Sequence, residues 1–575
     1  MSQKRLKKIR RIESVVVKGE EKVFLPKFFE IIKNNWKYLV VITLLAIGLY
    51  ANSLGGNFVS DDYLTIPQNP LIGDFWHTMT LTNFGNSMHL SNFVVNLFFG
   101  NTNPIPYHIM SLLWFLAFNV LGFVLIKLVS KNDMVAKLSM LLFVFHPIHV
   151  EAVSWIAGRI YLLLAVYILA SVINFIYFLD TGKYKNLILG LLFFYLGFST
   201  DRPRPFAAFF IVMLYVFMIG WRSVYKKYAK YFGMMVVVGL IGIVISWSYI
   251  NARITIVNGG INTTDSIFYN PFFQYPTAIA NYLQLLFFPV DLTLYHTMFV
   301  LPDWLNWLIL INYLALVVYF YFKDKRYFWA LSFIFVSVAP SMAPIKVSWL
   351  VAERYMFLGS LGFCMFLGLL LDEHRKKLKI ITPTLVGAII IFYGVRLVVR
   401  NYDWQTNHNL WVNTCQVSPN SHNAWNNIGD DYDKLKELDN AVKGFTQSVL
   451  VKPNYADAYH NRANIFYKSG RLDLARESYE IALRFSPGLF QTYFSLTQID
   501  LIEKKFDQAM AHAQKAVELQ PGNPQALYIL GVVYVQAGRI DDGKKVFESI
   551  LLQYPSYTQA NEALKAVKAL PPKQP

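Results

Sequence analysis

The sequence predicts an all-α protein in two parts: a polytopic helical membrane domain and, after it, a tetratricopeptide-repeat α-solenoid. The chain is 55% hydrophobic and 16% aromatic, which is unusual for a soluble protein. Apolar runs long enough to cross a bilayer recur as far as Arg400. Beyond that point the chain turns polar and carries regularly spaced prolines. We therefore place an N-terminal segment at 1–36, the membrane domain at 37–400 and the soluble domain at 401–575.

The N-terminal segment is basic and amphipathic. Its opening residues, "MSQKRLKKIRR", lack the short apolar core and small-residue cleavage site of a secretory signal. We expect it to stay attached on the cytoplasmic side. The net charge of +17 comes from basic residues that cluster beside apolar runs. This distribution favours the lipid bilayer as the partner and argues against nucleic acid.

Eleven crossings are expected in the membrane domain, because basic loops mark the cytoplasmic side and alternate with loops of a different character. The apolar stretch 276–300 contains Pro289 and Asp291, so we interpret it as re-entrant or interfacial. An odd number of crossings places the soluble domain on the outer face. The expected crossings lie near 37–54, 107–129, 134–156, 160–179, 186–200, 205–220, 230–250, 304–322, 327–344, 351–371 and 378–399.

Charged and polar residues gather in the outer loops. Such groups are costly near lipid unless they pair with one another or line a cavity, so their shared face predicts a site. Arg400, by contrast, is expected to extend toward the membrane interface, as long cationic side chains do at helix ends. The site candidates are Asp61, Asp62, His146, His149, Glu151, Arg159, Asp201, Arg202, Arg204, Lys346 and Arg354.

The acidic pair and the basic residues suggest complementary roles. A carboxylate can act as the general base on an acceptor hydroxyl, and repulsion within the pair would raise one pKa. We prefer Asp62 to Asp61 for this role. Guanidinium and ammonium groups suit the phosphate of a lipid-linked donor. The residues expected to bind it are Arg159, Arg202, Arg204, Lys346 and Arg354.

The histidines allow two interpretations. His146 and His149 with Glu151 resemble a divalent metal site, but Pro147 interrupts the helix and the spacing is not HExxH. We therefore expect these three side chains, with Asp201, to orient the substrate. No cofactor is assigned, and a bound divalent metal stays an alternative.

Five prolines, at 419, 453, 487, 521 and 555, are 34 residues apart. That period is typical of tetratricopeptide repeats. It predicts four full repeats over 422–555, a half repeat at 404–418 and a cap at 556–570. Such arrays bind proteins on a concave face, although a purely scaffolding role is the alternative.

The "DD" pair after the first span, "HPIHVEAVSWIAGR", "ERYMFLGSLGF" and the repeat array together resemble the transmembrane and tetratricopeptide repeat-containing O-mannosyltransferase family. The resemblance implies a C-type glycosyltransferase membrane fold and transfer of a sugar from a polyprenyl-phosphate donor to a protein hydroxyl. It also implies that Asp61 or Asp62 is catalytic and that Arg159 and Arg354 line the site. The short array favours a bacterial relative in the inner membrane, with a periplasmic or extracellular array.

One departure keeps other functions open. Where family members commonly carry a Lys-Glu pair, this chain has Asp201-Arg202. An oligosaccharyltransferase or a glycolipid-modifying transferase would use the same acidic and basic groups. A non-enzymatic membrane scaffold that recruits proteins through its array is the third reading.

Overall fold

The computed structural model describes residues 25–78, 87–201, 204–220, 270–342, 349–375, 377 and 379–569, with single positions between 228 and 251. Helices are the regular elements of these residues, and no strand occurs among them. The chain divides into two compact units between Leu410 and Trp411. The first unit holds the apolar helices, and the second holds the repeat array.

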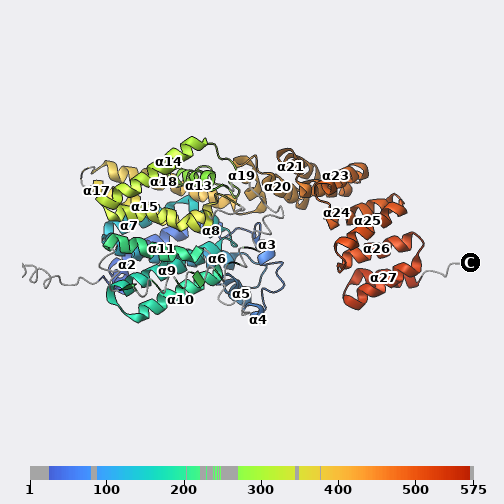
Figure 1. Cartoon of the computed structure of the whole chain (residues 1–575), viewed down its shortest axis with the longest axis horizontal. Coiled ribbons are helices and arrows are strands. Elements are labelled where there is room, and N and C mark those ends of the chain that lie inside the picture. Colours follow the sequence, from blue (N-terminus) through green and yellow to red (C-terminus); the bar gives the residue numbers. More distant parts are fainter. Residues whose placement is uncertain are drawn as a thin grey trace, which may run out of the picture. The chain divides into compact units, whose positions relative to one another are not determined.

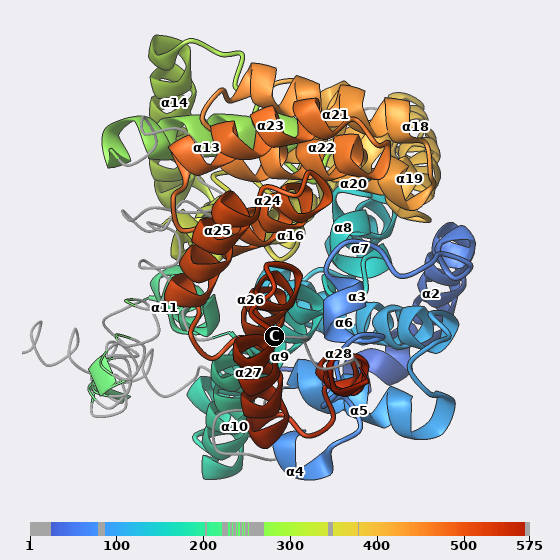
Figure 2. The same ribbon diagram turned by 90° about the vertical axis from the view of Figure 1, so that its right-hand side faces the viewer.

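Long helices run alongside one another in the first unit (Figure 1). Seen along these helices, α10 and α14 lie at opposite edges (Figure 2). The bounds are α2 (Phe28–Tyr50), α6 (Ile105–Ser130), α7 (Asp133–Phe145), α9 (Arg159–Thr181), α10 (Tyr184–Thr200), α11 (Ala207–Ile219), α13 (Pro271–Phe287), α14 (Asp303–Lys323), α15 (Lys325–Val338), α17 (Gly359–His374) and α18 (Ile381–Asp403).

Within the described residues, five helices are long and apolar enough to cross a membrane. They are the helix Phe28–Ser53, which includes α2, and α6, α9, α14 and α18. A sixth crossing results if α7 and the bent segment that follows it form one span. The chain is thus a membrane protein, and eleven crossings stay a prediction.

Two expected spans are interrupted. The span predicted at 134–156 breaks after Phe145, and the following helical segment Pro147–Ser154 is bent by 60°. Pro147 has no N–H to continue the helix, and the His146 ring accepts the N–H of Ile148 at 3.2 Å instead. The span predicted at 351–371 is likewise divided into a short helix, α16 (Glu353–Met356), and α17.

Two other predictions concern less regular stretches. The stretch 276–300 begins in α13 and has no helix after Phe287. Its re-entrant character stays a prediction. The N-terminal residues 1–24 and most of the span expected at 230–250 lie outside the described residues.

Short helices gather at one end of the first unit (Figure 1). They are α3 (Asp62–Thr65), α4 (Phe75–Thr78), α5 (Ser87–Phe99) and α8 (Val150–Ser154). Asp61 precedes α3 and Asp62 begins it, while α8 lies within the segment between α7 and α9. Two of the predicted outer loops, 57–69 and 145–159, therefore lie at this end.

The second unit contains helix pairs that follow the 34-residue period. Small residues let the paired helices approach closely, since a Cβ at Gly531 would lie 2.5 Å from the Phe547 ring. The pairs are α20 (His422–Lys434) with α21 (Leu438–Val451), α22 (Ala456–Lys468) with α23 (Leu472–Phe485), α24 (Phe490–Ile502) with α25 (Phe506–Leu519), and α26 (Pro524–Gln536) with α27 (Ile540–Gln553). Helix α19 (Asn407–Val417) precedes them, and α28 (Thr558–Lys568) follows.

Candidate active site

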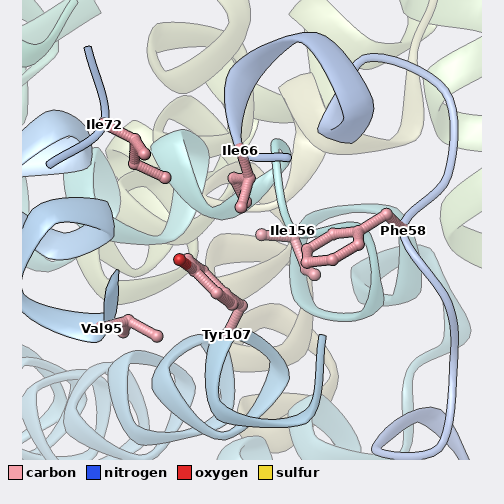
Figure 3. Close-up of a cluster of buried hydrophobic side chains, with 6 residues drawn as sticks. All are labelled: Phe58, Ile66, Ile72, Val95, Tyr107 and Ile156. Carbon is pink, nitrogen blue, oxygen red and sulfur yellow. The ribbon is translucent and has the colours of Figure 1, made fainter. Parts of the chain in front are cut away.

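The loop with the acidic pair is anchored by a small hydrophobic core. Phe58, Ile66 and Ile72 from this loop are buried against residues of α5, α6 and the segment before α9. Figure 3 shows that the side chains of Phe58, Ile66 and Ile156 point toward Tyr107. This packing holds residues 58–72 in a defined place at the end of the helices.

Asp62 is fully buried within this loop. Its Oδ2 accepts the backbone N–H of Val59 at 3.0 Å, and its Oδ1 accepts that of Ala157 at 2.7 Å. Burial raises the pKa of Asp62 to about 7 against the pull of these hydrogen bonds and of Arg159, while Asp61 adds to the rise. Burial, rather than repulsion within the pair, is therefore the main cause of the shift.

Asp61 is exposed, unlike its neighbour. The preceding residue, Ser60, has a positive φ of 52°, and its N–H is held by the side chain of Asn407 at 2.8 Å. Partial desolvation raises the pKa of Asp61, and the positive charge of Arg354 opposes the rise. Of the two carboxylates, Asp61 is the one exposed to solvent.

Arg159 is fully buried at the start of α9. Its guanidinium donates to Ser111 at 3.0 Å, to Ser91 at 2.7 Å and to the Tyr107 carbonyl at 3.2 Å. These uncharged partners belong to α5 and α6, so Arg159 links α9 to both helices. The contact between Arg159 and a donor stays a prediction. In the structure, the Arg159 side chain is enclosed by protein groups and holds α5, α6 and α9 together.

Arg354 is held by Glu151 across a large separation in sequence. Its guanidinium forms an ion pair with Glu151 Oε1, and its backbone N–H donates to Oε2 at 2.8 Å. The guanidinium also lies over the rings of Tyr355, at 5.0 Å, and Trp155, at 5.6 Å. The carboxylate and the rings together fix the orientation of the side chain.

Arg204 converges on the same rings. It forms an ion pair with Asp201 and lies 4.8 Å from the Tyr355 centroid and 5.1 Å from that of Tyr161. A pocket lined by both arginines and both tyrosines opens here, with Phe357 and Ser337 among its other walls. Two cationic groups thus meet at one pocket, each accompanied by one carboxylate.

Two predicted phosphate-binding residues lie outside the described residues. These are Arg202, next to Asp201 in the sequence, and Lys346, which precedes α16 in the sequence. Their roles stay predictions. Among the predicted cations with described positions, Arg204 and Arg354 are the ones brought to the pocket, whereas Arg159 is enclosed elsewhere.

The two histidines are buried with protein partners. His146 Nε2 lies 2.9 Å from the Leu286 carbonyl, and its other ring nitrogen accepts the Ile148 N–H. His149 Nε2 lies 2.7 Å from the Ser360 hydroxyl. In the part of the chain that the structure describes, no three His, Cys, Asp or Glu side chains form a group suited to a metal.

A second buried ion pair was missed by the sequence interpretation. Arg400 is fully buried, and its Nη2 donates to Glu353 Oε1 at 2.9 Å. The same guanidinium donates to Asp403 at 3.2 Å. The prediction that Arg400 extends to the membrane interface is therefore wrong, because a buried carboxylate is its partner. The adjacent opposite charges of Glu353 and Arg354 were the available sequence signal. They form two separate ion pairs, Glu353 with Arg400 of α18 and Arg354 with Glu151 of α8.

Comparisons with known proteins gave matches to the repeat array and to longer stretches of the chain. Tetratricopeptide repeat models match residues 500–570 and 456–489. Protein O-mannosyl-transferase TMTC3 of Mus musculus is 24% identical over 72% of this chain and 51% of its own length. The Homo sapiens protein of the same name is 24% identical over 72% of this chain and 52% of its own. The chain thus spans about half the length of these curated relatives.

Among solved structures, the crystal structure of YrrB, a TPR protein with an unusual peptide-binding site, covers 28% of this chain and 82% of its own, at 18% identity and a TM-score of 0.25. The matches to the O-mannosyl-transferases are longer than the repeat array, so they include much of the membrane unit. The chain is a membrane protein with a tetratricopeptide repeat array, related to the TMTC protein O-mannosyl-transferases.

Proposed function

We propose that the chain is a glycosyltransferase that moves a sugar from a polyprenyl-phosphate donor to a hydroxyl of a protein at the outer membrane face. The observation that carries this proposal is the pocket where Arg204 and Arg354 meet over Tyr161 and Tyr355. The printed names of the relatives, protein O-mannosyl-transferases, agree with this reaction class.

The two arginines suit the phosphate of the donor. A guanidinium has five N–H donors in a fixed plane, which match the oxygens of a phosphate. Glu151 and the rings hold Arg354 in one orientation before the donor arrives. A prearranged cation stabilises the charge that develops on the leaving phosphate better than mobile water does. Arg204, which lines the same pocket, would share this charge.

Asp61 is the carboxylate best placed to act as base. It is exposed, its loop is fixed by Asp62, and it lies within the electrostatic reach of Arg354. A raised pKa makes the Asp61 carboxylate a stronger base. Asp62, with both oxygens engaged by backbone N–H groups, acts as a positioning residue in this scheme.

The proposed step is a single displacement. The acceptor hydroxyl oxygen forms a bond to the anomeric carbon while its proton passes to the Asp61 carboxylate. The bond between that carbon and the phosphate oxygen breaks, and the electron pair leaves with the lipid phosphate toward Arg204 and Arg354. Attack from the opposite side inverts the anomeric configuration. The repeat array would bring the acceptor protein, a role consistent with the general use of such arrays.

The test uses the purified full chain in lipid nanodiscs with a panel of labelled polyprenyl-phosphate sugars and candidate acceptor proteins. We expect one donor to be consumed and its label to appear on serine or threonine of an acceptor. If no donor in the panel is bound or consumed, the transferase proposal fails. Transfer to a lipid or to asparagine would instead support the glycolipid-modifying or oligosaccharyltransferase alternative.

A further inference from the structure

The end of α18 and the start of α19 lie against the residues that lead to the acidic pair. Asn52 Nδ2 donates to the Val398 carbonyl at 3.0 Å, and Gln405 Nε2 donates to the Asn52 carbonyl at 2.9 Å. The backbone N–H of Asn57 donates to the Gln405 carbonyl at 2.8 Å. We call residues 398–407 the junction segment, and it lies within the first compact unit.

The last contact of the junction segment reaches the residue before Asp61. Asn407 Oδ1 accepts the backbone N–H of Ser60 at 2.8 Å, across 347 residues of sequence. Ser60 has a φ of 52°, a left-handed conformation that a residue with a Cβ seldom adopts without support. The hydrogen bond from Ser60 to Asn407 therefore stabilises a backbone conformation that is unfavourable for serine by itself. That conformation sets the direction in which the chain enters Asp61.

Capping of α19 does not account for this asparagine. An asparagine near the start of a helix commonly accepts backbone N–H groups of the first turn. Here Thr406 takes that part, because its hydroxyl accepts the N–H of Asn409 at 3.1 Å and its carbonyl accepts that of Leu410 at 3.1 Å. The Asn407 amide oxygen is directed to Ser60 instead. Its contact therefore serves the distant loop.

The junction segment also contacts the surroundings of the arginine pocket. The Trp404 ring stacks on that of Trp155, with 5.5 Å between the centroids, and the Arg354 guanidinium lies 5.6 Å from the Trp155 centroid. Arg400 Nη2 donates to Glu353, the residue before Arg354, at 2.9 Å. One short segment thus holds the neighbours of both the proposed base and the proposed phosphate-binding arginine.

We propose that Asn407 is a positioning residue for the base: by holding Ser60 in its left-handed conformation, it aims Asp61 at the acceptor hydroxyl. This inference deepens the proposed function, on which the role of Asp61 rests. A general base must lie within hydrogen-bond reach of the proton that it removes, and a misplacement of about 1 Å can cost about 10²-fold in rate. The donor phosphate is assigned to Arg204 and Arg354, so donor binding does not require Asn407.

The test compares three single variants of the full chain in nanodiscs. Asn407→Ala removes the amide oxygen that accepts the Ser60 N–H. Asn407→Asp keeps an acceptor oxygen at the same place. Asn409→Ala is the matched control, because the Asn409 side chain donates to the nearby Tyr402 carbonyl at 3.1 Å. Melting temperatures check that all the proteins remain folded.

Turnover is measured with a donor that the unmodified chain consumes. We expect Asn407→Ala to lower kcat about tenfold or more, with the Kd for the donor nearly unchanged. Asn407→Asp and the control should keep nearly normal kcat. Adding Ser60→Gly to Asn407→Ala should restore part of the lost kcat, because glycine adopts a positive φ without a Cβ penalty. Unchanged kcat in Asn407→Ala, or an equal loss in Asn407→Asp, overturns the proposal.

A second readout needs no donor. Hydrogen exchange followed by mass spectrometry reports the protection of backbone N–H groups in the loop that contains Ser60. We expect faster exchange of this loop in Asn407→Ala and unchanged exchange in Asn407→Asp and Asn409→Ala. Unchanged exchange in Asn407→Ala overturns the inference whether or not the chain transfers a sugar. If the unmodified chain consumes no donor while the expected exchange pattern holds, the transferase proposal fails and the hold of Asn407 on the loop stands.

Discussion

The carboxylate of Asp62 accepts the backbone N–H of Ala157 at 2.7 Å, although 95 residues separate the two in the sequence. This hydrogen bond joins the loop 57–69 to the end of the segment "FHPIHVEAVSWIAGR". It fixes the neighbour, Asp61, relative to the start of α9. The hydrogen bond therefore makes this loop part of the candidate site.

The buried state of Asp62 predicts a pH dependence of stability. Its pKa rises from the ordinary value of 3.8 to about 7 in the folded chain. Below pH 4 the carboxyl is protonated in both states, so it has no effect. Between pH 4 and 7 the unfolded state loses its proton first, and folding stability falls by an amount on the order of 4 kcal/mol. Above pH 7 this penalty stays constant.

The Asp62→Asn variant should lack this pH-dependent loss of folding stability. We therefore expect its melting temperature to fall less between pH 4 and 7 than that of the unmodified chain, measured in the same detergent. The comparison of the two slopes removes the contribution of the other titrating groups. Identical slopes would show that Asp62 is not a buried, proton-binding carboxyl.

Replacing Arg354 with lysine should reduce donor use. Lysine keeps the charge, but it cannot maintain the planar contacts with Glu151 and Tyr355. We expect the Kd for the donor to rise about tenfold or more. The control is Arg326→Lys, which alters a partly exposed ion pair with Asp324 just before α15. Unchanged donor binding in Arg354→Lys would remove Arg354 from the phosphate site.

Replacing Arg400 with leucine should destabilise the fold strongly. The substitution leaves Glu353 buried without the Arg400 guanidinium and with His296 at 3.7 Å, and breaking a buried ion pair typically costs about 3 to 5 kcal/mol. The matched change Arg375→Leu breaks a partly exposed pair with Asp372 and should cost less than about 1 kcal/mol. Denaturation of both variants in one detergent makes the comparison. Equal effects would contradict the structural role assigned to Arg400.

Removing residues 422–575 should separate donor binding from protein modification. The chain divides into two compact units near this point, so the membrane unit keeps the pocket between Arg204 and Arg354. We expect donor affinity to change less than threefold and modification of the acceptor protein to be lost. Equal loss of donor binding would instead indicate that the array has a structural role.

The sequence alone predicts the helical class and the repeat array well, because the 34-residue period and the apolar runs are local patterns. It also predicts one site for the acidic pair, Arg204 and Arg354. The structure brings Arg204 and Arg354 to one pocket, and the inclusion of the acidic pair stays a prediction. The sequence does not reveal which aspartate is exposed, because that depends on the fold of residues 58–72. Arg400 was misjudged for a similar reason, as its partner Glu353 lies 47 residues earlier.

The central claim is that Asp61 is the base and Asp62 positions it. The most direct measurement is the turnover of Asp61→Asn and Asp62→Asn in nanodiscs with a donor that the unmodified chain consumes. We expect Asp61→Asn to lower turnover about 10²-fold or more, the usual loss when a positioned base is removed, with donor binding and melting temperature unchanged. Asp62→Asn should lower turnover less. Near-normal turnover of Asp61→Asn, or a larger loss in a well-folded Asp62→Asn, would contradict the account.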